Sequence, residues 1–217
     1  MTMRIHAEAL LFDNDGTLVS SLESVRRCWT RWADEHGIAA EDFARVELHG
    51  RPAVDIIAEL LPADRIPGAL ARIERLEVED VPGGVELLPG TKELLASLPA
   101  GRWAVVTSAT RPLAEARLRE AGIDAPVVIA ADDITRGKPD PEPYLLAAAR
   151  LGVAPERCVV FEDAPAGLAA GRAAGMRTVA LATTHHRDDL VADVVVTDLS
   201  QVSAQVTAGG VEIGLTV

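Results

Sequence analysis

Short, continuous apolar segments alternate with segments of helical periodicity along most of the chain. The apolar segments span residues 9–12, 103–106, 127–129, 158–161, 178–181 and 194–196. They lack the polar alternation of a half-exposed strand, which indicates strands that are covered on both faces. Helical patterns lie between them, such as the one with Pro112 near its start and Gly122 at its end. This alternation predicts an α/β core with a doubly wound, Rossmann-like parallel sheet.

Local signals predict where three helices begin. Ser20 with Glu23 three residues later forms a capping-box pattern before an apolar helical face. Thr91 is expected to cap a second helix, and Asp140 followed by Pro141 is typical of an N-cap and a first helical residue.

Residues 19–88 break the strand–helix alternation. Their apolar residues recur at helical spacing in three groups, and the segment holds Trp29 and Trp32, which we expect in its own core. Residues 82–84, Pro-Gly-Gly, are typical of a hinge. We therefore expect residues 1–18 and 89–217 to form the α/β core, and residues 19–88 to form an inserted, all-helical cap. Residues 205–217 predict a β-hairpin around Gly209-Gly210.

Composition narrows the class of protein and its partners. The chain has 217 residues and a net charge of −12, with 21 Lys+Arg against 33 Asp+Glu. Nucleic-acid binding needs clustered cations, often with aromatic side chains for stacking, so we expect no nucleic-acid partner. Only two cysteines are present, far apart in sequence, which excludes a disulfide scaffold and a zinc ribbon.

The sequence also carries no signal for a membrane. No stretch of about 18 apolar residues is present, and the residues before Asp13 do not form a signal peptide. We therefore expect a cytoplasmic protein without a membrane partner, present as a monomer or a weak homo-oligomer.

Polar side chains follow four of the predicted strands, directly or, for Lys138, beyond a short loop. They are Asp13, Asp15, Thr107, Ser108, Lys138, Glu162 and Asp163. Ligands of open parallel sheets bind beyond the carboxyl ends of the strands, so these side chains are expected to converge. Carboxylates placed together are costly unless a cation shares the space, and oxygen-only ligands suit Mg²⁺. The sequence therefore predicts a magnesium and phosphate site at this edge.

The spacing of Asp13 and Asp15 predicts a reaction at such a site. A carboxylate held in line with a phosphorus atom can attack it and form an aspartyl-phosphate. A second carboxyl two residues along can protonate the leaving oxygen and then deprotonate the attacking water. The prediction is Mg²⁺-dependent hydrolysis of a phosphate monoester.

Four motifs resemble those of the haloacid-dehalogenase-like hydrolases, in order and over nearly the whole chain. They are Asp13-Asn14-Asp15-Gly16-Thr17-Leu18, Thr107-Ser108, Lys138-Pro139 and Glu162-Asp163-Ala164-Pro165-Ala166-Gly167. The resemblance implies a helical cap of the family's type one after the first motif. His49-Gly50-Arg51 and the fourth motif are most similar to those of small sugar-phosphate and polyol-phosphate phosphatases.

The resemblance also implies a role for each residue. Asp13 would be the nucleophile and Asp15 the acid and base. Mg²⁺ would be bound by Asp13, the Asp15 backbone carbonyl and Asp163, with Glu162 in support. Thr107, Ser108 and Lys138 would hold the phosphoryl group, and His49, Gly50 and Arg51 would reach the substrate from the cap.

Simpler interpretations exist for each residue taken alone. Asp13 and Asp15 could be turn residues, Asp163 and Thr107 could cap helices, and Lys138 could be a solvated loop lysine. A calcium loop is excluded because its register would put leucines where acids are needed. The coincidence of four such motifs at the ends of strands of one sheet favours a functional site. We expect His185 and His186, in contrast, to lie in a solvated loop.

Three competing functions are considered on the same scaffold. A β-phosphoglucomutase-like phosphomutase would carry a cap histidine ten residues after Asp15, where this chain has Val25. A haloacid dehalogenase lacks the leaving-group acid that Asp15 would supply. A non-catalytic binding protein is disfavoured because Asp13, Asp15, Lys138 and Asp163 are all intact. Hydrolysis of a small phosphorylated sugar or sugar alcohol is therefore the predicted function.

Overall fold

A parallel sheet forms the centre of the molecule. The computed structural model describes residues 2–46, 48 and 52–216, and within them this sheet has six strands in the order β6-β5-β2-β7-β8-β9. The strands are β2 (Ala9–Phe12), β5 (Trp103–Val106), β6 (Val128–Ile129), β7 (Cys158–Glu162), β8 (Arg177–Leu181) and β9 (Val194–Val196). All neighbouring pairs are parallel, which confirms the predicted doubly wound α/β fold.

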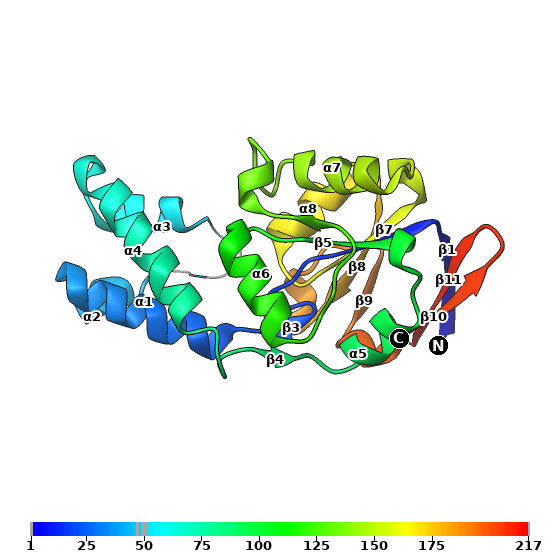
Figure 1. Ribbon diagram of the computed structural model, residues 1–217, viewed down its shortest axis with the longest axis horizontal. Helices are drawn as coiled ribbons and strands as arrows, with labels where there is room; N and C mark the ends of the chain where they lie inside the picture. The colour runs from blue at the N-terminus through cyan, green and yellow to red at the C-terminus, as the bar shows by residue number, and fades with distance from the viewer. Residues whose placement is uncertain (1, 47, 49–51, 217) are drawn as a thin grey trace.

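Helices cover both faces of this sheet (Figure 1). They are α5 (Thr91–Ala96), α6 (Arg111–Glu120), α7 (Glu142–Leu151) and α8 (Pro165–Ala173). Leu10 and Phe12 of β2 share a buried cluster with α5 and α6, whereas Ala9 and Leu11 share another with α7 and α8. Successive side chains of a strand point to opposite faces, so burial on both sides explains the continuous apolar segments of the sequence.

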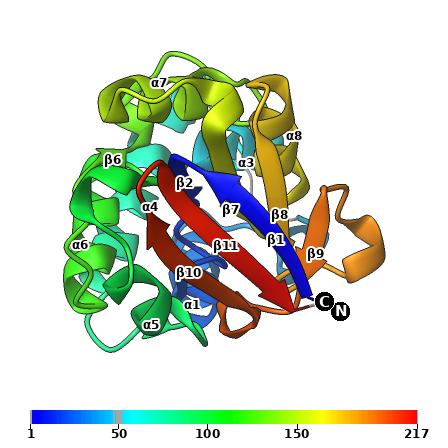
Figure 2. The ribbon, with the colours of Figure 1, turned by 90° about the vertical axis from the view of Figure 1, so that its right-hand side faces the viewer.

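A second, antiparallel sheet packs against the α5 and α6 side of the core (Figure 2). It has the order β1-β11-β10, with β1 (Thr2–Ala7), β10 (Val202–Thr207) and β11 (Gly210–Thr216). The β10–β11 hairpin confirms the turn predicted around Gly209-Gly210. Strand β1 is not among the strands predicted, because only Ile5 and Ala7 of its residues are buried and the rest are exposed.

Residues between β2 and α5 contain four helices with a core of their own, drawn on the left of Figure 1. We call them the cap helices: α1 (Leu22–His36), α2 (Ala40–Phe43), α3 (Ala53–Leu60) and α4 (Ile66–Glu79). Trp29 and Trp32 belong to this core, as predicted, and the Trp32 Nε1 donates to the Ala69 carbonyl at 2.9 Å. The exact domain limits at residues 18/19 and 88/89 stay a prediction.

A two-stranded ribbon joins the cap helices to the core. It consists of β3 (Val19–Ser20) and β4 (Glu86–Leu87), which pair antiparallel with Val19 opposite Leu87. The segment 19–88 was predicted to be wholly helical, so its first and last elements differ from the prediction. Short 3₁₀ turns complete the secondary structure of the described residues: η1 (Ala63–Arg65), η2 (Ala100–Arg102), η3 (Ala131–Asp133), η4 (Pro155–Arg157), η5 (Arg187–Asp189) and η6 (Leu199–Gln201).

Each of the three predicted helix starts is wrong by one residue. Ser20 lies in β3, and Ser21 precedes α1 without capping it, so the predicted capping box is absent from the described structure. Thr91 is the first residue of α5, and its hydroxyl donates to the Leu18 carbonyl at 2.9 Å instead of capping the helix. Asp140 lies one residue before the N-cap of α7, yet its Oδ1 accepts from the Glu142 N–H at 2.9 Å. For Ser20 and Thr91 the difference comes from contacts distant in sequence, which are the pairing of Ser20 with Glu86 and the hydrogen bond from Thr91 to Leu18.

Candidate active site

A cavity of about 340 Å³ lies between the carboxyl edge of the parallel sheet and the cap helices. Several of the predicted site residues lie here because they follow the ends of three adjacent strands, β5, β2 and β7. Asp13 follows β2, Thr107 follows β5 and Glu162 ends β7, with Asp163 next. The Asp13 N–H donates to the Phe161 carbonyl at 3.0 Å, which continues the β2–β7 ladder and fixes the Asp13 backbone beside Glu162.

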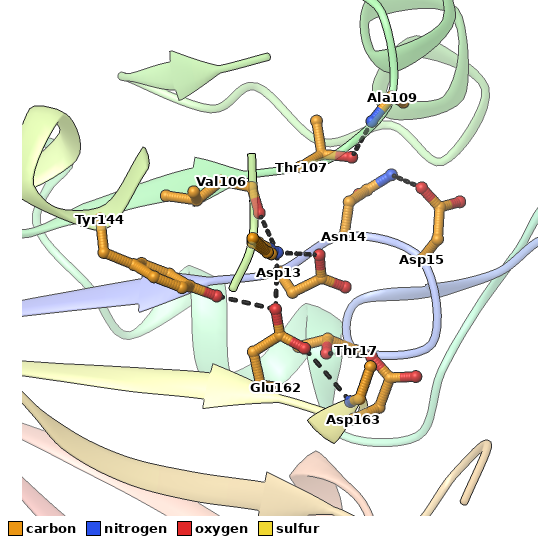
Figure 3. A network of polar contacts seen from close by, with 12 residues as sticks. Asp13, Asn14, Asp15, Thr17, Val106, Thr107, Ala109, Tyr144, Glu162 and Asp163 are labelled. Atoms are coloured by element: carbon orange, nitrogen blue, oxygen red, sulfur yellow. Dashed lines mark hydrogen bonds and ion pairs between the residues drawn. The ribbon is translucent and has the colours of Figure 1, made fainter. Parts of the chain in front are cut away.

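Lys138 is the centre of a buried network. Figure 3 labels its partners Asp13, Val106 and Glu162. Its Nζ lies 2.7 Å from Asp13 Oδ1, 2.5 Å from Glu162 Oε1 and 2.9 Å from the Val106 carbonyl. The Tyr144 hydroxyl donates to the same Glu162 oxygen at 2.8 Å. The Lys138 and Glu162 side chains are 6% and 1% exposed, so the ammonium lies out of solvent and the solvated-lysine interpretation is wrong. We call Asp13, Lys138, Glu162 and Asp163 the acidic floor.

The donor set of the acidic floor fits a hard divalent cation. One oxygen each from Asp13, Glu162 and Asp163 lie within 4.8 Å of one another. Three carboxylates face one ammonium, so the ionised floor lacks two positive charges, which is the charge of Mg²⁺. Carboxylate oxygens are the ligands that this ion prefers. The role of the Asp15 backbone carbonyl as a further ligand stays a prediction.

The ionisation of the acidic floor reflects this missing charge. Burial, with the charges of Glu162 and Asp163, raises the pKa of Asp13 well above its ordinary value against the opposing pull of Lys138. Burial and the Glu162 charge raise the pKa of Asp163 to about 7. Desolvation would lower the pKa of Lys138, but Asp13 and Glu162 outweigh it and raise the pKa above normal. Lys138 is therefore an ammonium, and a further cation would favour the ionised forms of Asp13 and Asp163.

Asp15 lies at the rim of the cavity with both carboxylate oxygens occupied. Its Oδ1 accepts from the Ser21 hydroxyl at 2.7 Å. Its Oδ2 is 3.0 Å from Nη1 of Arg117 and accepts from the Asn14 amide at 3.3 Å. Asp15 therefore lies apart from the network around Lys138.

Thr107 lies on the opposite side of Asp13 from Glu162 (Figure 3), and both Thr107 and Ser108 line the cavity. The Thr107 N–H donates to the Ile129 carbonyl at 2.9 Å, and its Oγ1 accepts from the Ala109 N–H at 3.1 Å. The N-cap of α6 is Thr110, so Thr107 binds the backbone ahead of this helix and does not cap it, contrary to the local interpretation. Its contact with a phosphoryl group, like that of Ser108, stays a prediction.

Residues from the loop after β8 complete the floor, and the sequence did not indicate them. The Thr184 hydroxyl donates to Asp163 Oδ2, and Thr17 donates to Asp163 Oδ1 at 3.3 Å. His185 Nδ1 lies 2.9 Å from the Thr184 hydroxyl, so His185 is half-buried beside the site and only His186 is exposed as expected. Position after a strand end was a usable signal, because these residues follow the fifth predicted strand.

The cap side of the cavity is mainly apolar. It is lined by Val25, Trp29, Leu48, Pro52, Ala53, Val54, Ile56 and Leu70, together with Glu74 and Glu77. Val25, which stands where the mutase histidine would be, thus faces the cavity. His49, Gly50 and Arg51 lie outside the described residues, so their expected role is a prediction only.

The similarity is not confined to the four motifs, because a model of a whole protein family matches most of the chain. The model of the haloacid dehalogenase-like hydrolases matches residues 7–175, from the last residue of β1 to just past α8. The chain belongs to this family. As a member it is an enzyme of the hydrolase class, and its cap helices agree with the inserted cap that the four motifs implied.

Curated relatives and solved structures extend the similarity beyond the matched segment. The chain is 42% identical to hexitol phosphatase A of Escherichia coli (strain K12), over 82% of this chain and 84% of that protein. It is 40% identical to validoxylamine A 7'-phosphate phosphatase of Streptomyces hygroscopicus subsp. limoneus, over 88% and 94%. CbbY from Rhodobacter sphaeroides, crystallised with phosphate, superposes with a TM-score of 0.78 at 29% identity, covering 90% and 96%.

None of the helices in the described ranges combines the length and apolarity needed to cross a bilayer. The expected cytoplasmic location and the monomeric or weakly associated state stay predictions.

Proposed function

We propose that this enzyme is a Mg²⁺-dependent phosphatase that hydrolyses a small phosphorylated sugar or sugar alcohol through an aspartyl-phosphate. One observation carries the proposal: Asp13, followed along the chain by the rim carboxyl Asp15, faces a cavity while its Oδ1 pairs with buried Lys138. Phosphoryl transfer to a carboxylate requires such an arrangement, because the nucleophile, a cation and a second carboxyl line the same cavity.

In the first step Asp13 attacks phosphorus, and the bond from phosphorus to the sugar oxygen breaks. Asp15 gives its proton to the departing oxygen. In the second step Asp15 takes a proton from water, the water oxygen bonds to phosphorus, and the Asp13–phosphorus linkage breaks. The ammonium of Lys138 balances charge on Asp13 and the phosphoryl oxygens throughout.

A bound Mg²⁺ would neutralise charge on the transferring phosphoryl group. Asp13, Asp163 and Glu162 are the residues that would hold it. Glu162 also receives hydrogen bonds from Lys138, Tyr144 and the Ala164 N–H, so we assign it to the support of the other ligands.

The substrate class rests on the relatives and on the cap side of the cavity. The names of both curated relatives specify a phosphate monoester of a polyhydroxylated compound. Apolar lining such as Trp29 and Val54 suits the C–H faces of a carbohydrate, and the two glutamates suit its hydroxyl groups. We place His49, Gly50 and Arg51 beside that substrate.

A substrate panel tests the proposal. Phosphate release is measured from p-nitrophenyl phosphate, hexitol phosphates, fructose 1-phosphate and glycerol 1-phosphate, each with Mg²⁺ and with EDTA. We expect Mg²⁺-dependent release and the highest kcat/KM on one of the sugar or polyol esters. Absence of release from every ester, or release that is equal in EDTA, would contradict the proposal.

The phosphomutase remains the second candidate, because it shares the fold and all four motifs. Val25 in place of a cap histidine disfavours it. Conversion of one sugar-phosphate isomer into another without release of phosphate would favour the mutase, and ³¹P NMR of the same reactions distinguishes the two outcomes.

A further inference from the structure

Arg117 is a buried arginine that no motif includes. It lies on α6, on the core side of the cavity, and its side chain is 5% exposed. A guanidinium this far from water needs anionic partners, because removing a charge from water is costly. Its Nη1 lies 3.0 Å from Asp15 Oδ2, and its Nη2 lies 3.9 Å from Glu77 Oε1.

Arg117 therefore links three parts of the molecule. Asp15 follows β2 in the core, Glu77 lies on the cap helix α4, and α4 packs directly against α6. Burial raises the pKa of Glu77 above its ordinary value, while the charge of Arg117 opposes this shift. Both carboxylates thus depend on the same guanidinium.

The two oxygens of Asp15 have partners of different chemistry. A guanidinium has donors only, so Oδ2 can face Arg117 only as an acceptor. The Ser21 hydroxyl that donates to Oδ1 can rotate and accept instead. Oδ2 therefore faces donors alone, from Arg117 and the Asn14 amide, and Oδ1 is the oxygen whose hydrogen-bond partner can change roles.

We propose that Arg117 is a positioning residue for Asp15: it fixes Oδ2, so that Oδ1 is the oxygen that exchanges the proton with the leaving group, and Glu77 aims the guanidinium from the cap. This inference rests on the proposed function, because it gives Asp15 the acid and base role. Arg117 acts through Asp15 and needs no contact with the substrate.

The kinetic test compares leaving groups. Alkyl phosphates such as a hexitol phosphate need protonation of the leaving oxygen, whereas p-nitrophenolate needs little. Arg117→Met should lower kcat about tenfold or more for the hexitol ester and less than about threefold for the nitrophenyl ester, with KM nearly unchanged. Arg117→Lys keeps the charge and one donor direction, and should restore part of the loss. Arg119→Met, an exposed arginine on the same helix, is the control and should change neither.

Glu77→Gln keeps the shape of the side chain and removes its charge. It should show a smaller loss with the same leaving-group preference, and it should add nothing in the Arg117→Met background, because Glu77 acts through Arg117. Equal losses on both esters would show a merely structural role for Arg117. A rise in KM with kcat intact would show a substrate contact, and either result would overturn the proposal.

A second measurement does not depend on turnover. Arg117→Met should lower the melting temperature less in the Asp15→Asn background than in the wild-type background, by at least about 3 °C. Identical shifts in both backgrounds would overturn the Arg117–Asp15 contact. If Arg117→Met does not fold, Arg117→Lys is compared in the same two backgrounds. An inactive wild type would overturn the proposed function, and the melting cycle would still decide whether Arg117 holds Asp15.

Discussion

The core side of the cavity carries buried charged groups, whereas the cap side is lined mainly by apolar side chains. The acidic floor holds its charges away from water, at distances of 2.5–2.7 Å around Lys138. The cap helices face the cavity mainly with apolar side chains and keep ion pairs such as Arg72–Glu35 and Arg27–Asp80 on their outer surface. Buried charge opposes folding unless it is balanced, whereas exposed pairs have little effect. Under the proposed function, the floor would supply the phosphate chemistry and the apolar cap side would contribute most to substrate choice.

The largest expected effect is on turnover when the nucleophile is changed. Asp13→Asn should lower kcat at least about a thousandfold, because an amide cannot form the phosphorylated intermediate. The fold should persist, since the change removes one of three crowded carboxylates. Phosphate release and circular dichroism check both points, with Asp34→Asn on the exposed surface of α1 as the control. Turnover within tenfold of wild type would refute the assignment of Asp13.

The next largest effect is on stability when the buried cation is removed. Lys138→Met should destabilise the protein by about 3–5 kcal/mol, because it leaves Asp13 and Glu162 buried without their counter-charge. Urea unfolding measures the loss, and added Mg²⁺ should recover part of it. Lys92→Met, which changes an exposed lysine of α5, should be near neutral. Equal stability of the two variants would mean that the floor is not charged as described.

Metal removal should change how stability depends on pH. The pKa of Asp163 is raised from 3.8 to about 7, so folding favours its protonated form. This contribution to stability is complete below pH 3.8 and is lost as pH rises through about 7. Mg²⁺ replaces the proton, so it should raise the melting temperature by about 4 °C more at pH 8 than at pH 5.5. Asp163→Asn should abolish that difference, and a Mg²⁺ effect independent of pH would contradict the site.

The smallest effect should come from the outer surface of the cap helices. Hydrogen bonds from Arg72, with those from Arg31, lower the pKa of Glu35 to about 2. The contribution of Glu35 to stability depends on pH in the opposite direction from that of Asp163. It is present above pH 4.5 and is lost as pH falls towards 2. Because the pair is solvent-exposed, Glu35→Gln should lower the melting temperature at pH 7 by no more than about 2 °C. A larger loss would mean that cap ion pairs stabilise the fold as strongly as the floor does.

The sequence predicted the floor better than its surroundings for a physical reason. Asp13, Glu162 and Asp163 lie at the ends of strands β2 and β7, whose burial on both faces gives a clear local signal, and parallel topology brings these ends together. Arg117 gave no such signal, because its meaning depends on a contact with Asp15 across 102 positions of sequence. Strand β1 was missed since its partner β11 lies at the other end of the chain.

The alternative hydrogen bonds open to serine and threonine side chains were the other source of error, at the predicted helix starts. Serine and threonine near a predicted helix start can cap the helix or bond elsewhere, and local sequence does not distinguish these outcomes. Ser21 bonds to Asp15 and Thr91 to the Leu18 carbonyl, both through contacts that exist only after folding. The apolar lining of the cap could be predicted as a helical face, but not which of its residues face the cavity.

The pairing of Val19 with Leu87 has a consequence for how such enzymes diversify. The chain leaves the core at Val19 and returns to it beside that point at Leu87, so the segment between them is a long loop with adjacent ends. Inserting residues between two neighbouring points disturbs the rest of a fold little, because closing a longer loop adds only slowly to its entropic cost. The whole segment could therefore be exchanged for that of another family member, transferring selectivity as a module, provided that the new segment keeps the partners that Ser21 and Glu77 offer to Asp15 and Arg117.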